Sequence, residues 1–328
     1  ESFKSAGLAA AAGGVTTIIA RPDTTPAIDT PEILEFVTRR AAEASPVRIH
    51  HMAALTKSRA GREMTEIGFL LDAGALAFTD CDHVTTDNKV LSRAFTYARS
   101  LGALVIGHPQ DPILSAGAAV TSGKFASLRG LPGVHPMAER MGFDRDMALV
   151  EMTGVKYHAD QITCARTLPA LARAKANGLD VTAGVSIHHL TLNDLDVGDY
   201  RTFFKMTPPL RPEEDRLAVV QAVADGLIDI ISAMHTPQDE ESKRLPFEEA
   251  ASGAVALQTL LPAAMRLYHA GAMDLPSLRR ANRRAGNPPD AAALEITLGP
   301  TRLSVDAPAT LVLDGAANDT ADIETGHD

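Results

Sequence analysis

The sequence contains no tryptophan, and aromatic residues make up only 4% of the chain, so Ala, Leu, Val and Ile must fill the interior. It has two cysteines, Cys81 and Cys164, without CxxC or Cys/His spacing, which excludes a disulfide framework and a thiolate zinc knuckle. No apolar run approaches the roughly 18 residues of a membrane span, and residues 1–5 lack a signal-peptide pattern. We therefore expect a cytoplasmic protein with no membrane partner.

Basic patches are also missing. The formal net charge is -10, and the basic residues form short pairs without interleaved aromatics. A nucleic-acid partner needs a basic surface, so this class of ligand is not expected.

What the chain does contain is an alternation of short apolar runs with longer helical stretches, which is typical of parallel strands joined by crossover helices. The predicted strands are 15–20, 47–54, 75–79, 103–107, 154–158, 181–186 and 227–232. The clearest predicted helices are 31–44, capped by Thr30, and 88–101, 167–177 and 212–225. The fold class is therefore α/β.

Two observations favour a closed (β/α)8 TIM-type barrel over an open doubly wound sheet. No Gly-rich phosphate loop follows the first strand, which ends in RPDTTP at residues 21–26. Polar residues recur just after the strand ends, where a barrel gathers its active site; they are Asp23, Thr56, Asp80, His108, His158, Asp160, His188 and His235.

The barrel is assigned to residues 1–285, and residues 286–328 are assigned to a C-terminal tail and partial β module. Residues 301–314 read as an extended segment of that module. The Gly- and Pro-containing interval 111–146 reads as a lid-like connection on the strand-end face, with a plain insertion as the alternative.

Several segments occur in the order found in one enzyme family. They are AAAAGGVTTII at 9–19 followed by RPDTTP, AFTD at 77–80, LPG at 131–133, VTA at 181–183 with HHL at 188–190, KMTPPLR at 205–211, and HTP at 235–237. Over residues 1–265 the chain resembles the dihydroorotase family of the amidohydrolase superfamily. The resemblance implies the amidohydrolase barrel, with a remnant of a small β-sandwich module.

The resemblance also implies zinc chemistry on a cyclic amide, in which dihydroorotate and water interconvert with N-carbamoyl-aspartate. Paired Zn²⁺ ions would activate the water and polarise the carbonyl. The family's first strand carries an HxH pair of ligands that would precede residue 1, so we expect the chain to be part of a longer one.

The family positions that are present are mostly altered. The bridging acid falls on Cys81, which Asp80 and Asp82 flank, and one histidine is kept as His108. The next histidine falls on Asp160, and the aspartate that serves as general acid/base falls on Met234. A thioether cannot exchange a proton at neutral pH and is a poor zinc ligand.

These positions give the candidate residues. The metal candidates are His108 and Asp160, the catalytic candidates are Asp80 and Asp160, and zinc is expected to be absent or weakly bound. The substrate-binding positions fall on Asp23, Thr207 and Gln238. Asp23 places a negative charge where a dicarboxylate-like substrate would lie, which opposes binding.

The candidate residues and their neighbours also allow alternative interpretations. His108 could be a hydrogen-bonded strand-end histidine, and His158 with Asp160 could form a new site because a spacing of two points both to one face of a strand. His188 and His189 read as structural strand residues that face opposite ways. Cys81 as a nucleophile lacks a visible base.

Three functions remain open. The first is a catalytically impaired dihydroorotase-like protein that acts as a structural partner of aspartate transcarbamoylase in pyrimidine biosynthesis and forms a homo-oligomer. The second is an active cyclic amidohydrolase that uses one metal on a pyrimidine precursor. The third is a sensor that binds such a metabolite without reacting it.

Overall fold

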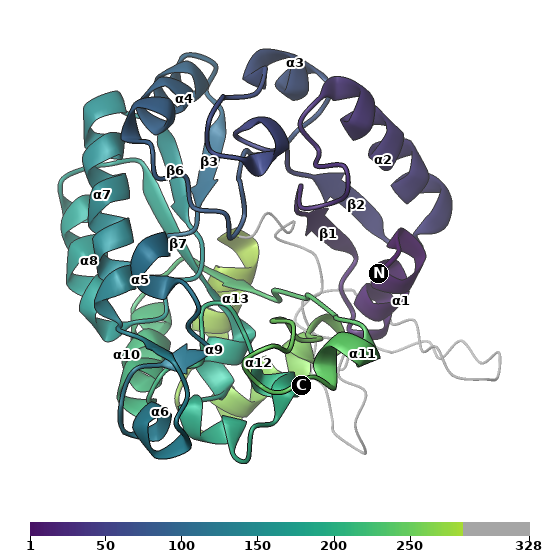
Figure 1. Ribbon diagram of the computed structural model, residues 1–328. Coiled ribbons are helices and arrows are strands. Elements are labelled where there is room, and N and C mark those ends of the chain that lie inside the picture. Colours follow the sequence, from purple (N-terminus) through teal and green to yellow (C-terminus); the bar gives the residue numbers. More distant parts are fainter. Residues whose placement is uncertain (285–328) are drawn as a thin grey trace, which may run out of the picture.

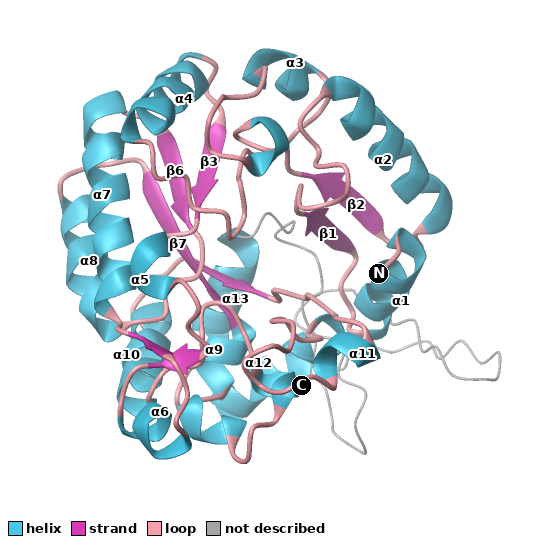
Figure 2. Ribbon diagram, viewed as in Figure 1, coloured by secondary structure: helices cyan, strands magenta, loops and turns pink. Residues whose placement is uncertain are grey.

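The computed structural model describes residues 1–284, in which parallel strands line the centre and helices cover the outside (Figure 1, Figure 2). The strands are β1 (Thr17–Ala20), β2 (Arg48–His51), β3 (Leu104–Gly107), β4 (Val120–Thr121), β5 (Gly133–Val134), β6 (Lys156–Ala159), β7 (Val181–Ser186) and β8 (Ile230–Ser232). The α-helices are α1 (Phe3–Ala12), α2 (Pro31–Ala44), α3 (Ile67–Asp72), α4 (Asn88–Ser100), α5 (Pro112–Ser115), α6 (Lys124–Arg129), α7 (Met137–Thr153), α8 (Leu168–Ala176), α9 (Ile187–Thr191), α10 (Glu213–Ala224), α11 (Glu240–Lys243), α12 (Leu260–His269) and α13 (Leu275–Arg284).

The strands follow one another around the barrel in chain order. β1 pairs with β2, and β3, β6, β7 and β8 form a second parallel sheet. Phe78 joins the two sheets, because it bridges Ala53 on one side and Val105 on the other. Within residues 1–284, β1 and β8 do not pair with each other, so seven strand positions are described.

All seven predicted strand segments pair, and the parallel α/β barrel is confirmed. The segment 75–79 does so through single bridges at Phe78 instead of a full strand. β7 has the predicted bounds 181–186, and the remaining strands are shorter than predicted. The lid-like interval holds α5, α6 and the small parallel pair β4 and β5 before α7 begins. The predicted tail 286–328, including 301–314, lies outside the described residues.

The helix ends follow local chemistry. α2 begins at Pro31, whose ring fixes a helical φ at the first position. Thr30 is the N-cap with extended backbone, but its side chain makes no capping hydrogen bond, which corrects the expected cap. At α4, Asp87 does cap, because its carboxylate accepts from the N–H groups of Lys89 and Val90.

The register of β6 separates the helical layer from the barrel interior. Tyr157 points outward, packs against Phe95 on α4, and donates a hydrogen bond of 2.5 Å to Asp146 on α7. His158 points the opposite way, toward β7, where its Nδ1 lies 2.8 Å from the Thr182 hydroxyl. Alternate residues of a strand therefore serve the core and the interior.

A second, smaller apolar cluster fastens the lid-like interval to the rest of the molecule. Phe125 and Leu131 pack there with Met206, Leu210 and Phe247. No helix within residues 1–284 combines the length and apolar character needed to cross a membrane.

Candidate functional site

Three barrel strands are followed by a residue in the left-handed backbone region that is not glycine. Cys81 has φ +59°, Gln161 has φ +62° and Met234 has φ +48°. Side chains with a Cβ pay a steric cost there, and such strain persists where the surrounding structure imposes it, often at functional sites. The strand-end face is therefore the candidate site.

A guanidinium lies at the centre of this face. Arg21 directly follows β1, and its Nη2 lies 3.0 Å from Asp23 Oδ2 and 3.6 Å from Asp82 Oδ1. Burial opposes its charge, but the neighbouring Cys81, Asp23 and Asp160 raise the pKa of Arg21 above its usual value. Nothing in the sequence pattern around residues 21–26 indicated this role for Arg21.

Cys81 occupies the position of the bridging acid and is 8% exposed. Burial raises the pKa of its thiol to about 11, although the hydrogen-bonding Arg21 opposes that rise. The side chain is therefore a neutral thiol near pH 7 and not a ready nucleophile or anionic ligand.

His108 and Asp160, the metal candidates, come from the ends of β3 and β6 and influence each other electrostatically. Burial lowers the pKa of His108, Asp160 raises it, and Arg21 lowers it. Burial likewise lowers the pKa of His158. Its Nε2 faces Gly184 on β7, where an added Cβ would lie 2.8 Å away, so His158 packs inside the barrel below Asp160.

Asp80, a catalytic candidate, is engaged in hydrogen bonds within the fold. Its Oδ1 accepts from the Thr56 N–H at 2.9 Å, and its Oδ2 accepts from the Thr56 hydroxyl at 2.7 Å and the Thr85 hydroxyl at 3.3 Å. Burial raises its pKa against these hydrogen bonds. This carboxylate fastens the loop after β2 to the loop after Phe78.

Each of the three predicted substrate-binding residues contacts a different group of the protein. Asp23 forms an ion pair with Arg21, so the guanidinium neutralises the negative charge that Asp23 places at this position. Thr207 is exposed, and its carbonyl accepts a hydrogen bond from Gln161 Nε2 at 3.3 Å. Gln238 is exposed and donates from Nε2 to the Ser252 carbonyl at 2.9 Å.

The segment after β8 offers no acid in place of Met234. The nearest carboxylate in sequence, Asp239, accepts from the Ser242 N–H at 2.8 Å as the cap of α11. His235 Nδ1 accepts from the N–H groups of Ala256 and Leu257, so its Nε2 donates to Glu1 at 3.0 Å.

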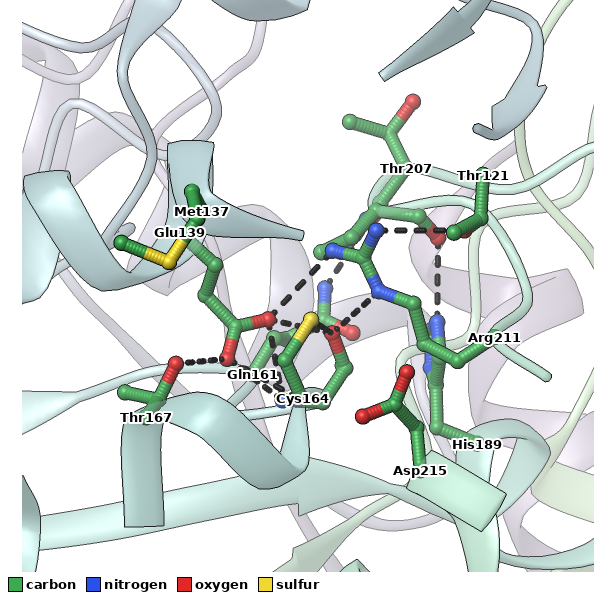
Figure 3. A network of polar contacts seen from close by, with 12 residues as sticks. Thr121, Met137, Glu139, Gln161, Cys164, Thr167, His189, Thr207, Arg211 and Asp215 are labelled. Atoms are coloured by element: carbon green, nitrogen blue, oxygen red, sulfur yellow. Dashed lines mark hydrogen bonds and ion pairs between the residues drawn. The ribbon is translucent and has the colours of Figure 1, made fainter. Parts of the chain in front are cut away.

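Beside the site lies a buried polar network centred on Glu139 and Arg211 (Figure 3). The Glu139 carboxylate accepts from the N–H groups of Thr163 and Cys164 and from the Thr167 hydroxyl. Arg211 donates to the hydroxyls of Thr163 and Thr121 at 2.9 and 3.1 Å. Because its groups satisfy one another, the network holds loops in place and does not present a reactive group.

His188 and His189 lie on the short helix α9, which corrects the expectation of a strand. His189 is fully enclosed; its Nε2 donates to the Pro208 carbonyl at 3.0 Å and its Nδ1 accepts from the Ser186 hydroxyl at 2.7 Å. Burial lowers the pKa of His189 to about 3 and that of His188 to about 4. The structural interpretation fits the contacts of His189, whereas the buried Nε2 of His188 has no hydrogen-bond partner among residues 1–284.

The chain is similar to known proteins of one family. A family model described as Dihydro-orotase-like matches residues 1–166, about half of the chain. A "Dihydroorotase-like protein" of Pseudomonas aeruginosa is 37% identical over 305 residues, covering 93% of this chain and 71% of that protein. The chain belongs to the dihydroorotase family. A "Dihydroorotase" of Wolbachia sp. subsp. Brugia malayi is 40% identical over 276 residues, which are 84% of this chain and 62% of that relative.

Solved structures support the fold of this dihydroorotase-family chain. The L-hydantoinase of Arthrobacter aurescens superposes with a TM-score of 0.74 at 20% identity, covering 85% of this chain and 64% of that one. The dihydroorotase of Saccharomyces cerevisiae superposes with a TM-score of 0.65 at 16% identity, covering 82% and 75%. A second family model, described as Carboxyltransferase domain, subdomain A and B, matches residues 267–325, which lie mostly beyond the described part.

The donor set does not fit the zinc that the family resemblance implies. Within residues 1–284, no three or more His, Cys, Asp or Glu side chains converge in a way that could hold a metal ion. Cys81 is a protonated thiol, Met234 is a thioether, and the buried Nε of Arg21 has no hydrogen-bond partner in this part of the chain. A guanidinium therefore stands among the groups that a metal would need.

Proposed function

We propose that this member of the dihydroorotase family does not carry out metal-dependent hydrolysis of a cyclic amide and serves as a structural partner of aspartate transcarbamoylase. The first half of this proposal, the absence of metal-dependent hydrolysis, rests on Met234. It stands at the end of β8, where the resemblance calls for a carboxylate that shuttles protons, and a thioether cannot do this. Zinc is then absent or weakly bound.

The surrounding residues support the same conclusion. Asp80 is committed to Thr56, and Asp239 is committed to the start of α11. Neither carboxylate is therefore free to take over the role that Met234 cannot fill. Loss of a catalytic centre leaves the barrel surface and its stability intact, so a scaffold role can survive it.

The partner half of the proposal comes from the resemblance, and an apolar surface gives it support. Arg129 at the end of α6 forms an ion pair of 2.8 Å with Asp199 and lies 5.7 Å from the centre of the Tyr200 ring. Large apolar side chains at or close in sequence to these residues face solvent. They are Leu128 at 75%, Tyr200 at 45% and Phe203 at 72% exposure. Grouped exposed apolar side chains are typical of protein interfaces.

The catalytic half is tested by assaying purified protein in both directions, with dihydroorotate and with N-carbamoyl-aspartate, after adding zinc or cobalt. We expect no turnover above the buffer rate, while an active dihydroorotase run in parallel reports that the assay works. Robust turnover would overturn the proposal. Turnover that disappears in His108→Asn would favour the alternative, a one-metal cyclic amidohydrolase.

The partner half is tested by mixing the protein with aspartate transcarbamoylase from the same source and measuring complex formation by analytical ultracentrifugation. We expect a complex that Phe203→Asp weakens. The matched control is Phe36→Asp on α2, which is also exposed, at 55%, but lies outside this surface. Absence of a complex, with both proteins folded, contradicts the scaffold role.

A further inference from the structure

Arg21 pairs with two carboxylates at the strand-end face of the barrel. Its Nη2 is 3.0 Å from Asp23 and 3.6 Å from Asp82, and the side chain is 24% exposed. Asp82 also lies 3.6 Å from Arg59, whose Nη1 donates to the Asp80 carbonyl at 3.3 Å. The Arg21 guanidinium thus links the loop after β1 to the loop after Phe78.

The charges around Arg21 nearly balance. Asp23, Asp82 and Asp160 contribute three negative charges, and the two guanidinium groups contribute two positive ones. Replacing Arg21 with a neutral residue would leave three carboxylates facing one cation, an excess charge that a divalent metal ion neutralises.

We propose that the guanidinium of Arg21 is the built-in cation of the strand-end site, where it neutralises the carboxylates itself and keeps a divalent metal ion out. An arginine is charged at every physiological pH and cannot dissociate from the protein. A metal ion entering the site would meet this like charge at close range in a partly dehydrated setting, where repulsion is stronger than in water.

The buried Nε of Arg21 agrees with this assignment. It has no hydrogen-bond partner among the described residues, although its neighbours include the Cys81 thiol and Asp160. A side chain selected only to pair with Asp23 could stay at the surface. Arg21 is instead mostly buried, with Cys81 and with Asp160, the residue that follows β6, among its electrostatic neighbours.

This inference deepens the proposed function, because it names the side chain that takes the place of a metal. Its test does not use turnover, so the two can fail separately. Binding of metal without catalysis would overturn the inference and leave the proposed absence of hydrolysis standing, whereas turnover would overturn that proposed absence.

The experiment compares the melting temperature of wild type, Arg21→Met and Arg21→Lys with and without cobalt, zinc or magnesium chloride. Met keeps much of the volume but removes the charge, and Lys keeps the charge. In Arg21→Met we expect a metal-dependent rise of about 5 °C when the metal exceeds its dissociation constant roughly 100-fold. Wild type and Arg21→Lys are expected to shift by less than about 1 °C under the same conditions.

A second measurement, on wild-type protein, tests the inference even if Arg21→Met does not fold. Wild-type protein is expressed with zinc in the medium and dialysed, and its zinc content is measured by mass spectrometry. We expect far less than one zinc per chain. One tightly held zinc per chain, lost in His108→Asn, overturns the inference, as does a folded Arg21→Met that responds to metal no more than wild type.

Discussion

The Glu139 carboxylate and the Arg211 guanidinium lie 3.4 Å apart, with side-chain exposures of 0% and 2%. Glu139 belongs to α7, whereas Arg211 belongs to the loop that precedes α10. The pair therefore joins segments 72 residues apart in the sequence, and it does so where water cannot compensate either charge.

Breaking this pair on one side should be costly. Arg211→Met is expected to lower the free energy of unfolding by about 3–5 kcal/mol, because Glu139 would remain as an uncompensated buried charge. Denaturant unfolding measures the loss, and the double variant Glu139→Gln with Arg211→Met should lose less than the sum of the single changes. Arg40→Met is the control, since the Arg40–Glu43 pair is more than half exposed and should cost at most about 1 kcal/mol. Equal losses at the two arginines would contradict the role assigned to Arg211.

The buried His189 predicts a loss of stability in acid. Its pKa is lowered to about 3 in the folded protein, against about 6.5 in the unfolded chain. The unfolded chain therefore takes up a proton below pH 6.5 that the folded protein refuses, so the contribution is complete above 6.5 and is lost as the pH falls toward 3.

The expected slope for this one group is about 1.4 kcal/mol per pH unit. The stability difference between wild type and His189→Gln should shrink by about 2 kcal/mol from pH 6.5 to 5, as measured by denaturant unfolding at each pH. The exposed His83, changed to Gln, serves as control and should leave the pH profile unchanged. A constant difference between wild type and His189→Gln across this range would rule out the titration.

The left-handed backbone of Met234 predicts an unusual order of substitutions. Asn tolerates this conformation better than a β-branched residue, so Met234→Val should be less stable than Met234→Asn by about 1–2 kcal/mol. Met152 is the matched control, because it is exposed on α7 and Val and Asn have similar helix propensities. Thermal unfolding of the four variants decides, and the same order at both positions would argue against strain at Met234.

The contacts of Asp80 predict that this carboxylate stabilises the folded protein. Asp80→Asn replaces an acceptor oxygen with an NH2 group facing Thr56 and should cost about 1–3 kcal/mol of unfolding free energy. Asp82→Asn provides the comparison, because Asp82 is 52% exposed and its ion pairs are 3.6 Å long, so its loss should stay below about 1 kcal/mol. An Asp80→Asn protein as stable as wild type would reopen a catalytic role for Asp80.

The barrel could be predicted from sequence because its signals are local. Several strands carry a short apolar run, and some of the following helices carry a start signal of their own, as at Pro31 for α2. The same local patterns could not set strand ends or the pairing of Phe78 with two neighbours, since pairing depends on residues distant in sequence. They also misassigned His188 and His189 to a strand.

The residue types at the family positions were fixed by sequence alone, so Cys81 and Met234 already indicated a changed chemistry. Only the tertiary structure placed Arg21 among Asp23, Asp82 and Asp160 and turned Asp80 toward Thr56. The sequence determines the charge of each side chain. Which other charges lie near it depends on how strands that are distant in sequence bring their ends together, and the electrostatic energy depends on the distance between the charges.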